Sequence, residues 1–319
     1  MNLKKAFCIL LLVPSFLFSQ EYKGTIKSSK TSEGLPYVNI GVPAKAWGFL
    51  SDENGNFKFK ATSEKEDEVI QISLVGYQTV LLNLQDLKGK CENNEAIYLN
   101  DVTYQLSQVT ITPNDYETRI LGNKKPEDLE CMELPKVSKD TAYIRMALEK
   151  GLDTNAYGIE FGNKIKIKEG HQNFIDKVQF KVCLNANDTA IYRINIYTKG
   201  KTIKRHLTAI GMVNEEKLIN VMKEPVIVKA FGKTEVKSVD LSAQNIEVAD
   251  DFIVGLECIY SSDQKMKVGV APSLFGSTDL FCRISVMSEW IKIPLIDLTF
   301  VSASVSYKKV PSFWQKLFN

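Results

Sequence analysis

Short segments in which apolar and polar residues alternate recur through most of this 319-residue chain and limit the folds that it can adopt. A period of two is typical of a β-strand with one buried face, whereas a helix repeats every 3.6 residues. Gly, Asn and Asp separate the segments and favour turns. The pattern therefore predicts an all-β protein with antiparallel sheets, and the length predicts two domains.

The first 19 residues have the pattern of a secretory signal peptide. Lys4 and Lys5 precede an apolar run that ends at Phe18, which is too short to span a bilayer as a helix, and the small residue Ser19 follows it. An uncleaved membrane anchor is the alternative. Cys8 lies at the start of the apolar run, so we do not expect lipidation. We predict residues 1–19 to be removed on export.

The charge and the cysteines constrain the partners and the compartment. Loss of the leader removes two lysines and no acids, so the formal charge falls from +2 to 0. A neutral protein gives no electrostatic reason to expect nucleic acid or an anionic membrane as partner. Five cysteines remain, without a CxxC pair: Cys91, Cys131, Cys183, Cys258 and Cys282. The last three lie in apolar segments and are predicted to be buried thiols, with a disulfide among them as the alternative.

Residues 20–111 form the first predicted domain, and the stretch SDENGNF (51–57) lies within it. Asn54-Gly55 is the strongest short signal for a β-hairpin turn. A calcium loop would need a closing carboxylate, but no acid follows until Glu64, so we favour the turn. The segment VIQISLVGYQTVLLNL predicts two strands broken at Gly76.

The spacing of motifs in this domain resembles the carboxypeptidase-D regulatory-like domain, a small transthyretin-like β-sandwich. The motifs are Gly24-x-Ile26, GLPYVNI (34–40), SDENGNF (51–57) and ISLVGYQ (72–78). The resemblance implies a fold and no active site, because metallocarboxypeptidases carry their zinc ligands on a separate catalytic domain. LSQVTIT (106–112) also resembles the segment after this module in outer-membrane TonB-dependent receptors, where Glu-Val replaces Gln108-Val109. The remaining chain is too short for a receptor plug and barrel, so the receptor identity does not carry over.

Residues 112–140 are polar, contain three prolines and are predicted to be an irregular linker. Residues 141–308 contain about eight further strand-like segments and predict a larger jelly-roll-like β-sandwich. Its segments VDLS and DFIVGLE resemble a β-sandwich unit of unassigned function in exported bacterial proteins. AYIRMALEKG (142–151) is interpreted as a strand, EEKLINVMK (215–223) as a short helix, and 309–319 as a tail that docks on its own domain.

No catalytic constellation is apparent. The chain lacks GxSxG, P-loop and GxGxxG motifs, and its two histidines, His171 and His206, fit no zinc motif and are expected in exposed loops. A glycosidase-type carboxylate pair cannot be selected from the sequence. We therefore predict no catalytic, metal or cofactor-binding residues. The following aromatic residues could stack on sugars, although a place in the core is favoured: Trp47, Tyr192, Tyr197, Tyr260 and Trp290.

The predicted function is that of a non-catalytic, exported binding or scaffolding protein of the cell envelope. The alternatives are a carbohydrate-binding protein and a hydrolase with an unidentified carboxylate pair. An envelope protein or a glycan is the expected partner, with no membrane span after removal of the leader. The expected location is the periplasm, the outer membrane or the cell surface. The polar linker predicts that the two domains fold independently.

Overall fold

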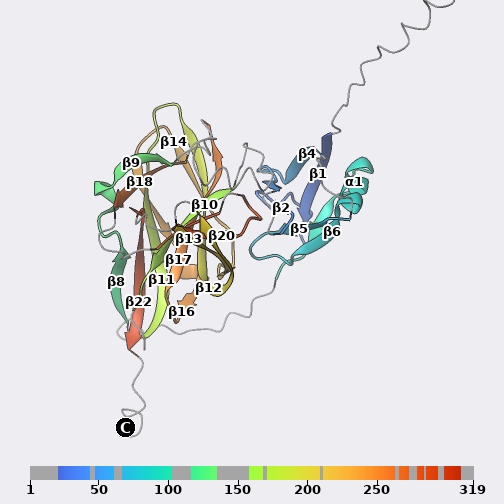
Figure 1. Ribbon diagram of the computed structural model, residues 1–319. Helices are drawn as coiled ribbons and strands as arrows, with labels where there is room; N and C mark the ends of the chain where they lie inside the picture. Colours follow the sequence, from blue (N-terminus) through green and yellow to red (C-terminus); the bar gives the residue numbers. More distant parts are fainter. Residues whose placement is uncertain are drawn as a thin grey trace, which may run out of the picture.

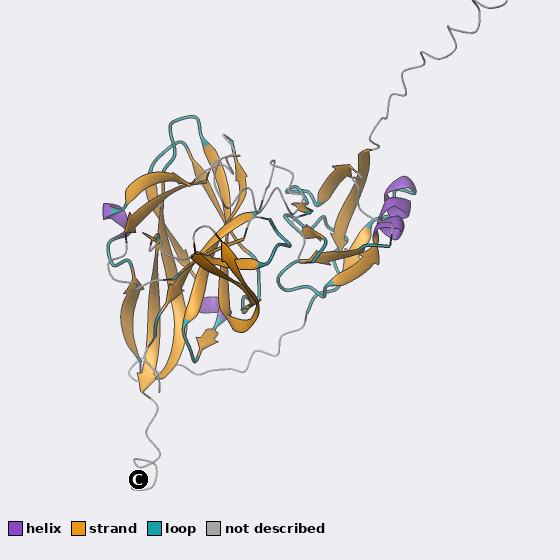
Figure 2. Cartoon of the chain, viewed as in Figure 1, coloured by secondary structure: helices purple, strands orange, loops and turns teal. Residues whose placement is uncertain are grey.

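Strands dominate the computed structural model of the chain (Figures 1 and 2), and the all-β prediction is confirmed. The structure describes residues 21–43, 47–60, 67–102, 116–134, 158–167, 171–208, 211–262, 266–272, 279–283, 285–293 and 298–309. The predicted signal peptide, the segments 106–112 and 142–151, and residues 310–319 lie outside these ranges. No helix in the described ranges has the length and apolar character needed to cross a membrane.

Residues 21–102, here called the N-terminal unit, form two small sheets around one core. One sheet has the order β4 (Asn56–Lys60), β1 (Glu21–Ser28) and β7 (Ile97–Leu99). The other has the order β3 (Gly48–Leu50), β2 (Asn39–Gly41), β5 (Val69–Ser73) and β6 (Val80–Asn83). Ile26, Ile40 and Ile72 are completely buried between them. The strands predicted on either side of Gly76 are β5 and β6, and Gly76 has a φ of +85°.

The N-terminal unit also contains an α-helix, α1 (Leu84–Glu92), which was not predicted. Asn83 caps it, because its side chain accepts a hydrogen bond from the backbone N–H of Asp86 at 2.6 Å. Leu84, Leu87 and Cys91 lie on one face and are buried. Leu84 directly continues the apolar residues of β6, so the sequence merges the two elements into one strand-like run.

The SDENGNF stretch is a turn but not the predicted hairpin. β3 pairs with β2 and β4 pairs with β1, so the stretch carries the chain from one sheet to the other. Only Gly55 of the central pair has a positive φ, at +80°, whereas a type I′ turn needs two such residues. The Asp52 carboxylate holds the turn by accepting the backbone N–H groups of Asn54 at 2.9 Å and Asn56 at 2.8 Å.

Residues 116–309, here called the C-terminal unit, form a larger sandwich of two sheets. The eight-stranded sheet contains β8 (Glu117–Gly122), β9 (Glu130–Leu134), β11 (His171–Val182), β15 (Glu235–Asp240), β16 (Ile246–Val248), β18 (Met266–Pro272), β21 (Leu298–Thr299) and β22 (Val301–Lys309). The seven-stranded sheet contains β10 (Ile159–Ile165), β12 (Thr189–Thr208), β13 (Gly211–Asn220), β14 (Val226–Phe231), β17 (Phe252–Ser261), β19 (Leu280–Arg283) and β20 (Trp290–Ile293). Phe180, Tyr192 and Leu256 are buried in the core between the sheets.

Six strands of the seven-stranded sheet close into a ring. β12 pairs first with β17 and then, farther along, with β13, and the ring continues through β20, β19 and β10 back to β17. β12 is long enough for both pairings, with 20 residues, and its register shifts between Lys199 and Thr202, as at a β-bulge. Side chains alternate between the two faces of a strand. One face of this sheet therefore meets the sandwich core, and the other lines a small barrel lumen.

The linker prediction for residues 112–140 is wrong where the structure describes them. β8 pairs with β22 and β9 pairs with β18, so both strands extend the eight-stranded sheet. A disulfide joins Cys131 in β9 to Cys183, which follows β11. The prediction that Cys183 is a buried thiol is therefore wrong, and its partner Cys131 lies outside the three cysteines for which a disulfide was the alternative.

Three further local predictions are wrong. The segment predicted as a helix at 215–223 lies largely in strand β13, which ends at Asn220. His171 begins β11, and His206 lies within β12, so neither histidine is in a loop. Strand pairing decides these conformations: β13 pairs with its neighbour β12 and with the distant β20, and β11 pairs with the distant β22.

Candidate functional site

A row of four charged side chains crosses the lumen face of the barrel. Arg283, Glu160, Glu257 and Arg193 come from the neighbouring strands β19, β10, β17 and β12, and the register places each beside the next. Both glutamates are 0% exposed and Arg193 is 1% exposed. Arg283 Nη2 lies 2.6 Å from Glu160 Oε2, and Arg193 Nη1 lies 3.5 Å from Glu257 Oε2. Each carboxylate is thus completely buried and has a guanidinium partner.

Neutral side chains complete this polar cluster. Asn195 Nδ2 donates to Glu160 Oε1 at 2.9 Å, and the Tyr197 hydroxyl donates to the same oxygen at 3.0 Å. Gly255 leaves space for the carboxylate, since a Cβ there would lie 2.2 Å from Glu160 Oε1. The cluster is therefore shaped around the Glu160 side chain.

Burial is the largest cause that raises the pKa of Glu160, to about 7. The positive charge of Arg283 opposes the shift, and the neighbouring Glu257 carboxylate adds to it. Burial also raises the pKa of Tyr197 well above its usual range, so its hydroxyl stays protonated. Two adjacent carboxyl groups, one with a pKa near neutrality, are a feature of acid–base sites. Here, however, both are sealed from solvent.

The open mouth of the barrel is separated from these carboxylates. Its recess of about 430 Å³ is lined by three lysines and three aspartates: Lys164, Lys199, Lys292, Asp250, Asp251 and Asp279. Ile253 and Phe281 form its apolar base. They pack in one cluster with Tyr197 and Trp290, whose rings meet edge to face at 5.1 Å. Along β17 and β12, Ile253 and Tyr197 of this cluster lie between the residues of the mouth and the buried charges.

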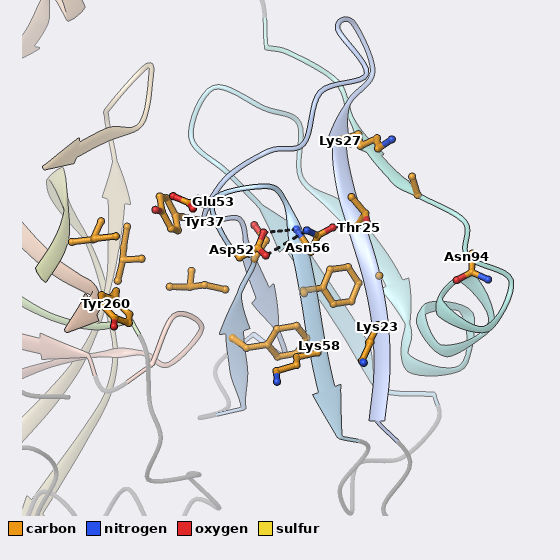
Figure 3. Close-up of a pocket in the computed structure, with 18 of the residues that line it drawn as sticks. Lys23, Thr25, Lys27, Tyr37, Asp52, Glu53, Asn56, Lys58, Asn94 and Tyr260 are labelled. Atoms are coloured by element: carbon orange, nitrogen blue, oxygen red, sulfur yellow. Dashed lines mark hydrogen bonds between the residues drawn. The ribbon is translucent and has the colours of Figure 1, made fainter. Parts of the chain in front are cut away.

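A second and larger recess lies between the two units (Figure 3). This junction groove has a volume of about 1020 Å³. The N-terminal unit contributes, among others, Lys23, Lys58 and Tyr37, and the C-terminal unit contributes Ile191 and Tyr260. Figure 3 shows Tyr260 on a different part of the chain from the labelled lysines. Most of the lining belongs to the N-terminal unit, and Ile191, Ile259 and Tyr260 of the C-terminal unit complete it.

The groove offers apolar rings and charges of both signs. The Tyr260 side chain is 40% exposed, and Phe49 lies in the opposite wall. The exposed lysines Lys23 and Lys58 share one acidic neighbour, Glu21, at 3.6 and 3.9 Å. Such a mixed lining is typical of a binding surface, in which an apolar contact is oriented by a few polar groups.

The structure distributes the predicted aromatic candidates unevenly. Tyr192, Tyr197 and Trp290 are buried, as the core interpretation requires, and Trp47 packs edge to face on Phe49. Of the five candidates, Tyr260 alone lines the groove.

The histidines form no zinc site in the described residues. The His171 ring lies 4.9 Å from the Tyr307 ring, and the backbone of His206 pairs with Val213. Within the described part of the chain, no group of three or more His, Cys, Asp or Glu side chains is placed to hold a metal ion.

Sequence reasoning did not find the buried charges. Each lies among apolar residues of a strand-like segment: Glu160 in GIEFG, Arg193 in IYRINI and Glu257 in GLECI. One signal could have pointed to these charges. A strand-like segment whose residues are apolar at successive positions is usually buried on both faces, so a charged residue within it is expected to be buried as well.

Comparison with known proteins identifies the family of the N-terminal unit. Residues 22–111 match the family described as "CarboxypepD_reg-like domain". These residues are a CarboxypepD_reg-like domain. The match confirms the resemblance on which the first fold prediction depended, and the domain supplies one wall of the junction groove.

A curated relative and a solved structure also show similarity. A stretch of 157 residues, 48% of this chain, is 26% identical to "TonB-dependent receptor P3" of Formosa agariphila. The match spans 14% of that receptor, so the chain corresponds to a small part of its relative. The solved structure of infectious bursal disease virus Gx strain matches 92% of this chain and 76% of its own, at 8% identity. Its TM-score of 0.21 is too low to support an argument about the fold.

Proposed function

We propose that this protein is an exported, non-catalytic binding protein of the cell envelope and that the junction groove is its binding site. The observation that carries this proposal is the composition of the groove, which takes its walls from both units. Export is supported by the leader pattern and by the Cys131–Cys183 disulfide, since such bonds persist in oxidising compartments. The similarity to an outer-membrane receptor is consistent with a role in the envelope.

The buried carboxylates argue against hydrolysis. A glycosidase needs two carboxyl groups on either side of a bound sugar, roughly 5–10 Å apart. Glu160 and Glu257 are completely buried, each beside an arginine, and neither lines the junction groove or the barrel mouth. A general acid or base must come within hydrogen-bond distance of its substrate. Their burial supports a role within the barrel rather than in a reaction.

A carbohydrate ligand is the second candidate, and Tyr260 is the observation that favours it. Its ring is exposed in the groove, where a sugar face could stack on it. Lys23, Asp52 and Lys58 lie in the same lining and could bind hydroxyl groups. If the ligand is a glycan, the protein should bind purified sugars alone. If the ligand is another envelope component, it should not.

Co-sedimentation of the mature protein with outer-membrane vesicles of the producing bacterium tests the proposal, with a glycan array in parallel. Tyr260→Ala and Lys58→Glu should weaken vesicle binding. Phe231→Ala is the matched control, because Phe231 is 59% exposed but lies outside the groove lining. Binding to the array would favour the carbohydrate candidate. Groove variants that sediment like the wild type would contradict the assignment of the site.

A further inference from the structure

Arg193 lies where the C-terminal unit meets the CarboxypepD_reg-like domain. It belongs to β12, yet its guanidinium binds two acceptors in the other unit. Nη1 donates to Asn39 Oδ1 at 3.1 Å, and Nη2 donates to the backbone carbonyl of Tyr37. One buried side chain thus links the barrel to β2 and to the segment just before it.

Contacts inside the barrel hold the Arg193 side chain in this orientation. Its ion pair with Glu257 is completely buried, and Glu257 also lies near Arg283, at 3.7 Å. If the Arg193 guanidinium moved into solvent, a buried carboxylate would lose a partner, which is strongly unfavourable. The charge row therefore restricts Arg193 to the side of the barrel that faces the CarboxypepD_reg-like domain.

The residues that Arg193 connects lie beside the junction groove. Tyr37 lines the groove on one side. Ile191, which is two residues before Arg193 on the same face of β12, lines it on the other. We propose that Arg193 is a positioning residue that fixes the CarboxypepD_reg-like domain against the C-terminal unit and so sets the shape of the groove. The role in ligand binding rests on the proposed function, whereas the role in fixing the two units does not.

The apolar contacts at the junction lack this directionality. A Cβ at Gly48 would lie 2.7 Å from a methyl carbon of Val286, and one at Gly41 would lie 2.8 Å from Met287 Cγ, so these glycines allow close apolar contact. Apolar surfaces can slide past one another, because the hydrophobic effect is not directional. A planar guanidinium with two acceptors fixes an orientation.

Distance measurement between spin labels in the full-length mature protein tests the positioning role. Leu81→Cys and Ile219→Cys place labels on exposed positions of the two units. Cys258→Ser removes the partly exposed native thiol, while Cys91 and Cys282 are buried. The wild-type pair should give a narrow distance distribution. Arg193→Lys, which keeps the charge beside Glu257 but not the planar fork, should broaden it.

Two further variants keep the test decisive. Asn39→Ala removes an acceptor without altering the barrel and should also broaden the distribution. Lys229→Ala removes the exposed ion pair with Glu53 at the same junction and should leave the distribution narrow. Near-ultraviolet circular dichroism, to which the buried Trp290 and the other ordered aromatic rings contribute, reports whether the tertiary structure is retained. Unchanged distributions in Arg193→Lys and Asn39→Ala with native spectra would overturn the proposal.

Vesicle binding by the same variants tests the effect on the groove. Arg193→Lys should weaken binding about tenfold, which corresponds to about 1.4 kcal/mol, while Lys229→Ala should bind like the wild type. A broad distance distribution with undiminished binding would refute the claim that Arg193 sets the groove. If the wild type does not bind vesicles, the proposed function fails, and the distance distributions still decide whether Arg193 fixes the two units.

Discussion

Removal of the Cys131–Cys183 disulfide should lower the stability of the C-terminal unit substantially. The bond closes a loop between residues that are 52 positions apart. Loop closure restricts the unfolded chain, and the chain-entropy relation for a loop of this length gives about 4 kcal/mol at 25 °C. The folded state should change little, because β9 is also held by its pairing with β18 and by the Lys181 ammonium, which donates to the Leu129 carbonyl at 2.7 Å.

Urea unfolding of the wild type and of the Cys131→Ala, Cys183→Ala double variant measures this difference. A reductant should destabilise the wild type by a similar amount and leave the double variant unaffected, which is the control for other effects of the reductant. Alkylation of the denatured chain before and after reduction should differ by two thiols if the bond is present. If the disulfide is present in the wild type but its removal lowers the free energy of unfolding by less than about 1 kcal/mol, the entropic reasoning is refuted.

Three other substitutions test the barrel and the turn. In the wild type, the pKa of Glu160 is about 7 in the folded state and 4.5 ordinarily, so between these values the folded state holds a proton that the unfolded state has lost. The free energy of unfolding of the wild type therefore falls as pH rises from 4.5 to 7, by up to about 3 kcal/mol. Glu160→Gln cannot titrate and should remove this part of the pH dependence. Urea unfolding at pH 5 and 7.5 measures this, and an unchanged slope in the variant would contradict it. Gly55→Val should lower stability by about 1 kcal/mol or more, because φ is +80° and a Cβ would meet the Ile26 carbonyl oxygen at 2.5 Å. Gly89→Ala, where a Cβ meets nothing within 4 Å, is the control and should not destabilise the protein. Trp290→Ala should cost about 3–5 kcal/mol by calorimetry, since its side chain is 4% exposed, and a small loss would contradict its core role.

The sequence predicted the CarboxypepD_reg-like domain well because its signals are local. Glycines at turns and alternating apolar residues mark short strands within each segment, whichever strand they pair with. Gly76 illustrates this, because its positive φ separates two strands that pair directly with each other. The helix α1 was missed because its apolar face continues the apolar residues of β6 without a break.

The C-terminal unit was harder to predict because distant segments decide its structure. β8 is an edge strand with mostly exposed residues, so its composition resembles that of a loop. Its partner β22 lies at the other end of the unit, and a segment read alone does not show this pairing. The Cys131–Cys183 pair has the same origin, since connectivity follows from spatial proximity and not from spacing.

Whether the two domains fold independently depends on where the chain is divided and on the buried contacts of Arg193 at the junction. A fragment that starts near Ser138 would lack β8, β9 and one half of the disulfide, so the linker boundary drawn from composition divides the C-terminal unit itself. A division between residues 102 and 116 would keep both sheets complete, but it would still remove the two acceptors that Arg193 binds. Water would then take the place of these two acceptors, at a modest net cost in free energy. The ion pair with Glu257 would still keep Arg193 in place. The fold of the barrel and the placement of the CarboxypepD_reg-like domain are therefore separable in energy, and the junction groove depends on the second.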